Sequence, residues 1–173
     1  MKPWLIAVAL CLTLVMGCTP PLTGSVPPNA PPGLAVHTPQ QRAEFEPVLN
    51  RYFYLRKQAV ITGDLTKLWA QYPALREGTN AQTGVNAEAD VLARYRALQV
   101  IDGDIDSATY ERFLVQEDGD RAVLLINGTE LYLTREFKRS GGALQLLLYL
   151  ERQGGAWTIV KTDETTLPEA KQH

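Results

Sequence analysis

The spacing of apolar residues changes once along this chain, near Asp102, and that change constrains the fold more than any other feature. Before it, from residue 40 onward, apolar residues recur at the three- and four-residue intervals of amphipathic helices. After it, they form short runs separated by turn sequences such as "EDGD" and "QGGA", which is typical of antiparallel strands. The order predicts an α+β domain, with three helices packed on a curved antiparallel sheet of four to five strands.

Three helices are predicted before the change. The first has its apolar face at helical spacing and ends at Gly63, with Pro47 placed in its first turn. Asp64 is expected to cap a short second helix. A third helix is expected over residues 87–101, with Asn86 as its cap.

The strands are expected in residues 108–116, 121–126, 143–152 and 157–164, with a further stretch after Asn127. Asn127-Gly128 is either a tight hairpin turn or a bulge in one long strand, and the sequence leaves both open. Leu146 and Leu148 share one face of their strand, whereas Leu147 lies on the other. A strand that is apolar on both faces is expected to lie centrally in a covered or curved sheet.

The helix break at Gly63-Asp64 and the glycine-rich turn before Trp157 resemble features of the nuclear transport factor two-like superfamily, over residues 40–165. The resemblance implies a cone, in which a curved sheet wraps around the first helix and leaves a cavity at the wide end. In that superfamily the cavity serves isomerases and dehydratases, binds a ligand or partner, or is filled. The residues expected to approach it here are Tyr52, Tyr54, Trp69, Tyr95 and Asp102. Core packing at helical spacing is the alternative for the aromatic members of this set, and it is the one that the sequence favours.

Residues 1–17 are predicted to be a signal peptide, because their apolar run is shorter than the ~20 residues of a membrane-spanning helix. The run ends in "LVMGC", which resembles the lipobox of bacterial lipoproteins. A small residue at Gly17 gives a peptidase access, and the thiol of Cys18 can carry a diacylglycerol anchor. The resemblance implies a protein attached to the bacterial cell membrane, on its extracytoplasmic face, through acylated Cys18. An ordinary cleaved signal and an uncleaved membrane helix are the alternatives.

Residues 18–39 comprise Cys18 and a proline-rich linker, and residues 166–173 form a tail. Most of the prolines of the chain lie in this linker, which lacks the backbone donors and the apolar content of a folded core. It is expected to be a partly extended tether that holds the domain near the bilayer.

Composition disfavours several kinds of site. Loss of the leader would leave Cys18 as the only cysteine, and the two histidines are His37, in the linker, and His173, at the end. Zinc sites of Cys and His and triads that use His are therefore disfavoured. The sequence "DGDID" begins like a calcium loop, but Ser107 and Phe113 stand where the glycine and the closing glutamate belong. No metal or cofactor is expected, and a net charge of −2 argues against nucleic-acid binding.

Two classes of function fit these expectations. The favoured one is a tethered domain without catalysis that binds a small apolar ligand or an envelope protein, and a homodimer is compatible with it. The alternative is an extracytoplasmic isomerase or lyase that uses Asp102 or Glu111 as base with a tyrosine donor. The two differ in whether a carboxylate and a tyrosine hydroxyl converge in one apolar pocket.

Overall fold

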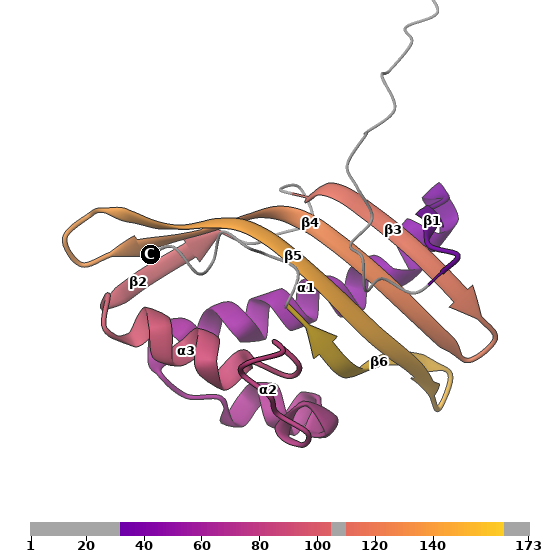
Figure 1. Ribbon diagram of the computed structural model, residues 1–173, viewed down its shortest axis with the longest axis horizontal. Coiled ribbons are helices and arrows are strands. Elements are labelled where there is room, and N and C mark those ends of the chain that lie inside the picture. Colours follow the sequence, from indigo (N-terminus) through magenta and orange to yellow (C-terminus); the bar gives the residue numbers. More distant parts are fainter. Residues whose placement is uncertain (1–31, 105–109, 165–173) are drawn as a thin grey trace, which may run out of the picture.

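Three α-helices and six strands build the fold in the computed structural model, which describes residues 32–104 and 110–164. The helices all lie against one antiparallel sheet (Figure 1), so the predicted α+β class is confirmed, with six strands in place of four to five. The elements are β1 (Ala35–Val36), α1 (Pro39–Thr62), α2 (Thr66–Gln71), the 3-10 helix η1 (Pro73–Arg76), α3 (Glu88–Arg96), β2 (Val100–Asp104), β3 (Tyr110–Asp118), β4 (Arg121–Thr134), β5 (Arg139–Gln153) and β6 (Ala156–Asp163).

Helix α1 begins earlier than the sequence analysis predicted. Thr38 and Gln41 form a capping box, in which each side chain accepts a hydrogen bond of 3.1 Å from the backbone N–H of the other. Pro47 therefore lies inside the helix, and its placement in the first turn was wrong. The helix tolerates it because Pro47 and Ala43, whose carbonyl loses its helical donor, both face solvent. The helix ends as predicted at Gly63, which has a left-handed φ of 74°.

Helix α3 is shorter than predicted, and its extension to residue 101 was wrong. The chain leaves the helix after Arg96, and Gln99 adopts a left-handed φ of 49°. Strand β2 starts immediately afterwards at Val100 and pairs with β4 from Thr134. Sheet pairing thus overrides the apolar spacing of residues 97–101.

Asn86 does not cap α3, contrary to prediction. Its backbone is left-handed, with a φ of 48°, and its side chain joins two other segments. The amide oxygen accepts from the N–H of Thr162 at 2.9 Å, and the amide nitrogen donates to the carbonyl of Glu77 at 2.6 Å. Asn86 therefore joins the end of β6 to the segment that follows η1.

Strand β4 runs unbroken through Asn127 and Gly128, so these residues form no hairpin turn. They pair with Gln145 and Leu144 of β5, and the register shift lies on the neighbouring strand β3, between Tyr110 and Arg112. The sheet order is β1-β3-β4-β5-β6, and β2 pairs with the far end of β4. Strands β4 and β5 consequently form one long antiparallel arm.

The end of the predicted linker belongs to the fold. Ala35 in β1 pairs with Val115 of β3, and Leu34 packs against the sheet beside it. His37 contacts the same strand, with Nδ1 2.8 Å from the carbonyl oxygen of Phe113 and its ring stacked on the Phe113 ring. Backbone pairing is available to this stretch because its prolines lie on either side of β1.

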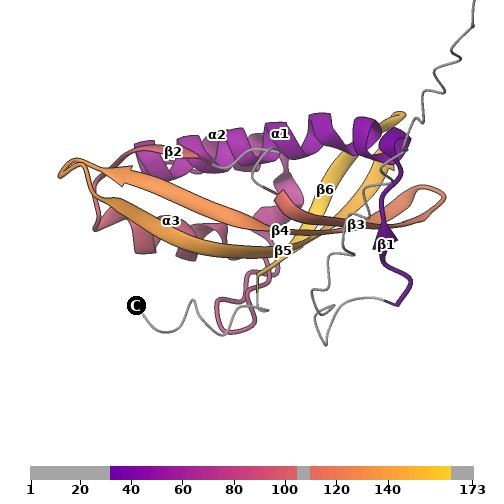
Figure 2. The same cartoon turned by 90° about the horizontal axis from the view of Figure 1, so that it is seen from above.

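Apolar side chains cover both faces of the sheet, as the leucine pattern of β5 predicted. Helix α1 runs along one face (Figure 2), where Leu146 and Leu148 join the main core. The opposite face carries a smaller cluster of Leu114, Leu125 and Leu147. Because α1 lies directly against the sheet, any polar side chain on its inner face must find its partners within the fold.

Candidate functional site

The residues predicted to line a cavity do not all come together. Tyr52 is fully buried on the inner face of α1, and Tyr95, half-buried on α3, has its ring centre 4.3 Å from that of Tyr132. Trp69 lies on α2 beside Arg76, and the Asp102 side chain is 71% exposed on β2. Only Tyr52 and Tyr95 approach a common centre.

Tyr54 projects outward and is half-exposed. The side chain of Glu111 and the whole of Cys18 lie outside the described part of the structure. The nearest charged partner of Asp102 is Lys57, at 3.9 Å. Of the two bases proposed for the enzymatic alternative, Asp102 is thus separate from the buried tyrosines.

The common centre is a buried ion network around Arg56 of α1, which the sequence analysis missed. One guanidinium nitrogen lies 3.0 Å from Oε2 of Glu130 on β4, and another pairs with Glu164 just after β6. Burial alone lowers the pKa of Arg56, but the two carboxylates outweigh it and hold the pKa above its usual value. The network fastens α1 to two strands of the sheet.

A sequence signal for Arg56 exists. It stands four residues after Tyr52 and three before Ala59, both on the buried face of α1. A charged residue in that position must be paired inside the fold.

A second buried carboxylate, Glu88 of α3, completes the centre. Its Oε1 accepts hydrogen bonds from the Tyr52 hydroxyl at 2.9 Å and from the Thr162 hydroxyl at 2.7 Å. Burial raises the pKa of Glu88, and the hydrogen bonds from these hydroxyls together with Arg56 only partly offset that effect. A carboxylate and a tyrosine hydroxyl therefore do converge, but the carboxylate is Glu88 and not Asp102.

Tyr95 and Tyr132 form the other side of the centre. Burial, followed by the nearby charge of Glu130, raises the pKa of both phenols. They stay protonated at neutral pH, so each can act as a hydrogen-bond donor. The arrangement holds protonated phenols beside buried carboxyl groups within packed side chains, as expected for a group that fixes the helix on the sheet.

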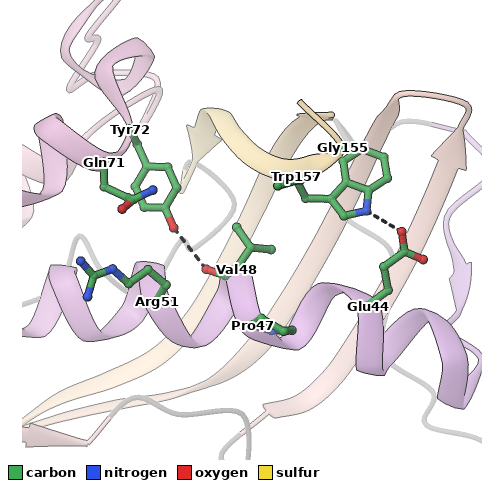
Figure 3. Close-up of a pocket in the computed structure, with 9 residues that line it drawn as sticks. Glu44, Pro47, Val48, Arg51, Gln71, Tyr72, Gly155 and Trp157 are labelled. Carbon is green, nitrogen blue, oxygen red and sulfur yellow. Dashed lines mark hydrogen bonds between the residues drawn. The ribbon is translucent and has the colours of Figure 1, made fainter. Parts of the chain in front are cut away.

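An open groove of about 370 Å³ lies outside the core, between α1, the end of α2 and the turn into β6 (Figure 3). Its central feature is Trp157, whose indole N–H donates to Glu44 at 2.7 Å. Arg152 also bonds Glu44 at 2.7 Å and lies 4.5 Å above the indole ring. The indole is therefore held in one orientation before any ligand binds.

The opposite wall of the groove is Tyr72. Its hydroxyl donates to the carbonyl of Val48 at 3.3 Å, and burial raises its pKa to about 12. Pro47 and Val48 form the floor on α1, and Arg51 stands at the rim. Among the described residues Arg51 makes no ion pair, although its guanidinium lies 5.8 Å from the Tyr54 ring.

The described ranges contain no group of three or more His, Cys, Asp or Glu side chains arranged to hold a metal ion. Within the same ranges, no helix has the length and apolarity needed to cross a membrane.

No protein-family model and no curated protein matches the chain. Among solved structures, the chain is similar to one described as a calcium/calmodulin dependent protein kinase II association domain from Xanthomonas campestris. The two share 18% sequence identity, over 68% of this chain and 84% of that chain, with a TM-score of 0.43. At this TM-score the likeness identifies neither a family nor an activity.

Proposed function

We propose that this protein is a lipid-anchored domain of the bacterial cell envelope that binds a partner protein without catalysis. Acylated Cys18 is its anchor, and the order of three helices before the five longer strands of the sheet supports its placement in the nuclear transport factor two-like superfamily. The observation that carries the binding role is the groove around Trp157, where an aromatic side chain is oriented by Glu44 and Arg152 in advance. Preorganised aromatic residues in partly buried grooves are typical anchors of protein interfaces.

The chemistry of the groove indicates what would bind there. Val48, Pro47 and Trp157 offer an apolar floor and wall to an aliphatic or aromatic side chain. Arg51 at the rim offers a cation without an ion-pair partner in the described structure. We therefore propose an exposed segment of a neighbouring envelope protein that carries an apolar residue next to a carboxylate.

The filled interior makes the enzymatic alternative less favourable. An isomerase would need its base beside a substrate cavity, but Asp102 is exposed on β2 and the Tyr52–Glu88 pair is enclosed by core side chains. The groove, by contrast, is open to solvent and needs no rearrangement of the core.

The anchor is tested by replacing Cys18 with serine. We expect Cys18→Ser to lose incorporation of labelled palmitate and to keep its leader, because the thiol that accepts the lipid is gone. Cys11→Ser is the matched control, since Cys11 lies within the leader and should leave both lipidation and cleavage intact. Normal palmitate labelling of the Cys18→Ser chain would refute the anchor.

The groove is tested in cells with a photo-crosslinking residue in place of Gln71, which lines it. We expect a crosslink to one envelope protein, reduced at least about tenfold by Arg51→Glu because a rim cation becomes an anion. Arg121→Glu, on an exposed residue at the start of β4, is the control and should leave the crosslink unchanged. If the crosslink is equally strong in both charge variants, the groove is not the binding surface.

A further inference from the structure

The hairpin that joins β4 to β5 ends in an exposed aromatic side chain. This loop lies at one extreme of the long axis of the molecule (Figure 1), and Phe137 within it is 80% exposed. Beside it lie Leu98, in the turn between α3 and β2, and Ile101, the second residue of β2, which are 41% and 40% exposed. The two turns are joined by a hydrogen bond of 3.1 Å from the N–H of Arg135 to the carbonyl of Gln99. Together Leu98, Ile101 and Phe137 form the apolar tip.

The backbone at Phe137 is unfavourable for its residue type. Its N–H donates to the carbonyl of Thr134 at 2.9 Å, and the carbonyl of Lys138 accepts from the N–H of Thr134 at 2.9 Å. This tight turn gives Phe137 a φ of 58°, a left-handed value that glycine or asparagine adopts much more readily. Glycine here would relieve the strain and remove an exposed ring, so folding does not account for phenylalanine. Strain of this kind is commonly kept at functional positions.

Cations surround the apolar tip. Arg135, Lys138 and Arg139 line a recess of about 400 Å³ next to it, together with the turn that contains Leu98. Glu136 is the one acidic residue in this recess, and it is bonded to Lys138 at 2.7 Å. Within the described structure Arg135 and Arg139 make no ion pair. The net charge of the chain is −2, so the positive charge at this end of the molecule is opposite in sign to the charge of the whole chain.

We propose that the apolar tip docks onto the surface of an anionic lipid bilayer. Phe137 would lie at the level of the headgroups, where aromatic rings are favoured, and Arg135 and Arg139 would face lipid phosphates. A narrow projecting loop offers too little area for a stable interface with a folded protein, which buries roughly 800 Å² per partner. A bilayer, in contrast, adapts to a single inserted side chain flanked by cations.

This inference rests on the proposed function, because it requires the lipid anchor at Cys18 and the apolar tip to reach the same bilayer. The length of the linker and the distance from β1 to the β4–β5 hairpin allow this. β1, which follows the linker, pairs with β3 at Val115, and Val115 in turn pairs with Leu124 of β4. Thr134 lies ten residues further along β4, about 33 Å away at ~3.3 Å per residue. The sixteen residues that follow Cys18, up to Leu34, could extend to about 50 Å at ~3.1 Å per residue. Cys18 and Phe137 can therefore reach the same membrane.

The test uses the lipidated full protein in vesicles, with Phe137→Cys carrying an environment-sensitive dye. Cleavage removes Cys11 and the lipid blocks Cys18, so this is the only free thiol. We expect a blue shift of dye emission in vesicles that contain phosphatidylglycerol but not in pure phosphatidylcholine, and reversal at high salt. Arg135→Glu with Arg139→Glu should weaken the response at least about tenfold. Val36→Cys, on an exposed residue in β1, is the control and should not respond.

The outcomes separate the two proposals. Protein that stays on the vesicles while the dye at residue 137 does not respond overturns the docking proposal and leaves the anchor intact. If Cys18 also reacts with the dye, the chain is unlipidated and the anchor fails. The emission of the dye at residue 137 in the same vesicles then tests docking of the apolar tip without the anchor. An unresponsive dye again overturns docking.

Phe137→Gly supplies an independent measurement, since it should raise the melting temperature while it weakens binding to the anionic vesicles.

Discussion

Replacing Arg56 with methionine is expected to lower the free energy of unfolding by about 3–5 kcal/mol. Methionine has a similar length and packs well, so the loss comes from charge and not from volume. The substitution leaves the buried carboxylate of Glu130 without a cation, and Glu164 keeps only the more distant Arg94, at 3.8 Å. Arg56 is 3% exposed, so water cannot replace the guanidinium. Urea unfolding at neutral pH, followed by far-UV circular dichroism, measures the change.

Lys57 is the matched control for this prediction. It is the next residue on α1, its side chain is 29% exposed, and its partner Asp102 lies 3.9 Å away on the surface. Lys57→Met should change stability by less than about 0.5 kcal/mol. Glu130→Gln in the Arg56→Met background should recover part of the loss, because it removes one unpaired buried charge. Equal effects of Arg56→Met and Lys57→Met would show that the ion network contributes nothing particular to the fold.

The sequence predicted the elements whose apolar pattern extends over many consecutive residues of one helix or strand. Gly63 and the apolar residues before it defined α1, and the alternation of Leu146, Leu147 and Leu148 placed β5 between two apolar layers. Burial of one face dictates such patterns, so they remain visible without knowledge of the tertiary structure.

Elements that depend on distant partners escaped prediction. β1 has two residues and exists only because β3 offers backbone groups to it. β2 follows the left-handed turn at Gln99, whose conformation has no signal in its residue type. Asn127-Gly128 carries a typical turn sequence, yet pairing with β3 and β5 on either side holds it in a strand.

The candidate site was predicted only in part, because some of its residues follow a local pattern and others meet only through the tertiary structure. The aromatic residues Tyr52 and Tyr95 lie on inward faces of helices, so helical spacing brought them near the centre. Tyr52 bonds Glu88 of α3, and Arg56 pairs with Glu130 of β4. Only the tertiary structure shows that these residues meet. Asp102 was predicted as a cavity residue because it is a carboxylate where the helical pattern ends. The pairing of β2 with β4 leaves its side chain at the surface.

The arm formed by β4 and β5 depends on a single glycine, and Gly141→Ala is expected to destabilise the protein by about 3 kcal/mol. Gly141 has a φ of 133°, and a Cβ built there would lie 2.0 Å from the carbonyl oxygen of Glu130. Because both atoms belong to paired backbones, relief requires the strands to separate beside the residue that holds Arg56. We therefore expect the variant to lose stability through the arm and the ion network together.

Gly142→Ala is the control that isolates the cause. Gly142 is adjacent in the same strand and pairs with Glu130, but its Cβ would meet no atom within 4 Å and it needs no left-handed conformation. Alanine there should be neutral or stabilise by up to about 1 kcal/mol, because it reduces the entropy of the unfolded chain. Thermal and urea unfolding of both variants give the comparison. If the two alanine variants have the same stability, the close approach of the strands at Gly141 does not limit stability. The expectation that separation of the strands at Gly141 weakens the Arg56 ion network is then refuted.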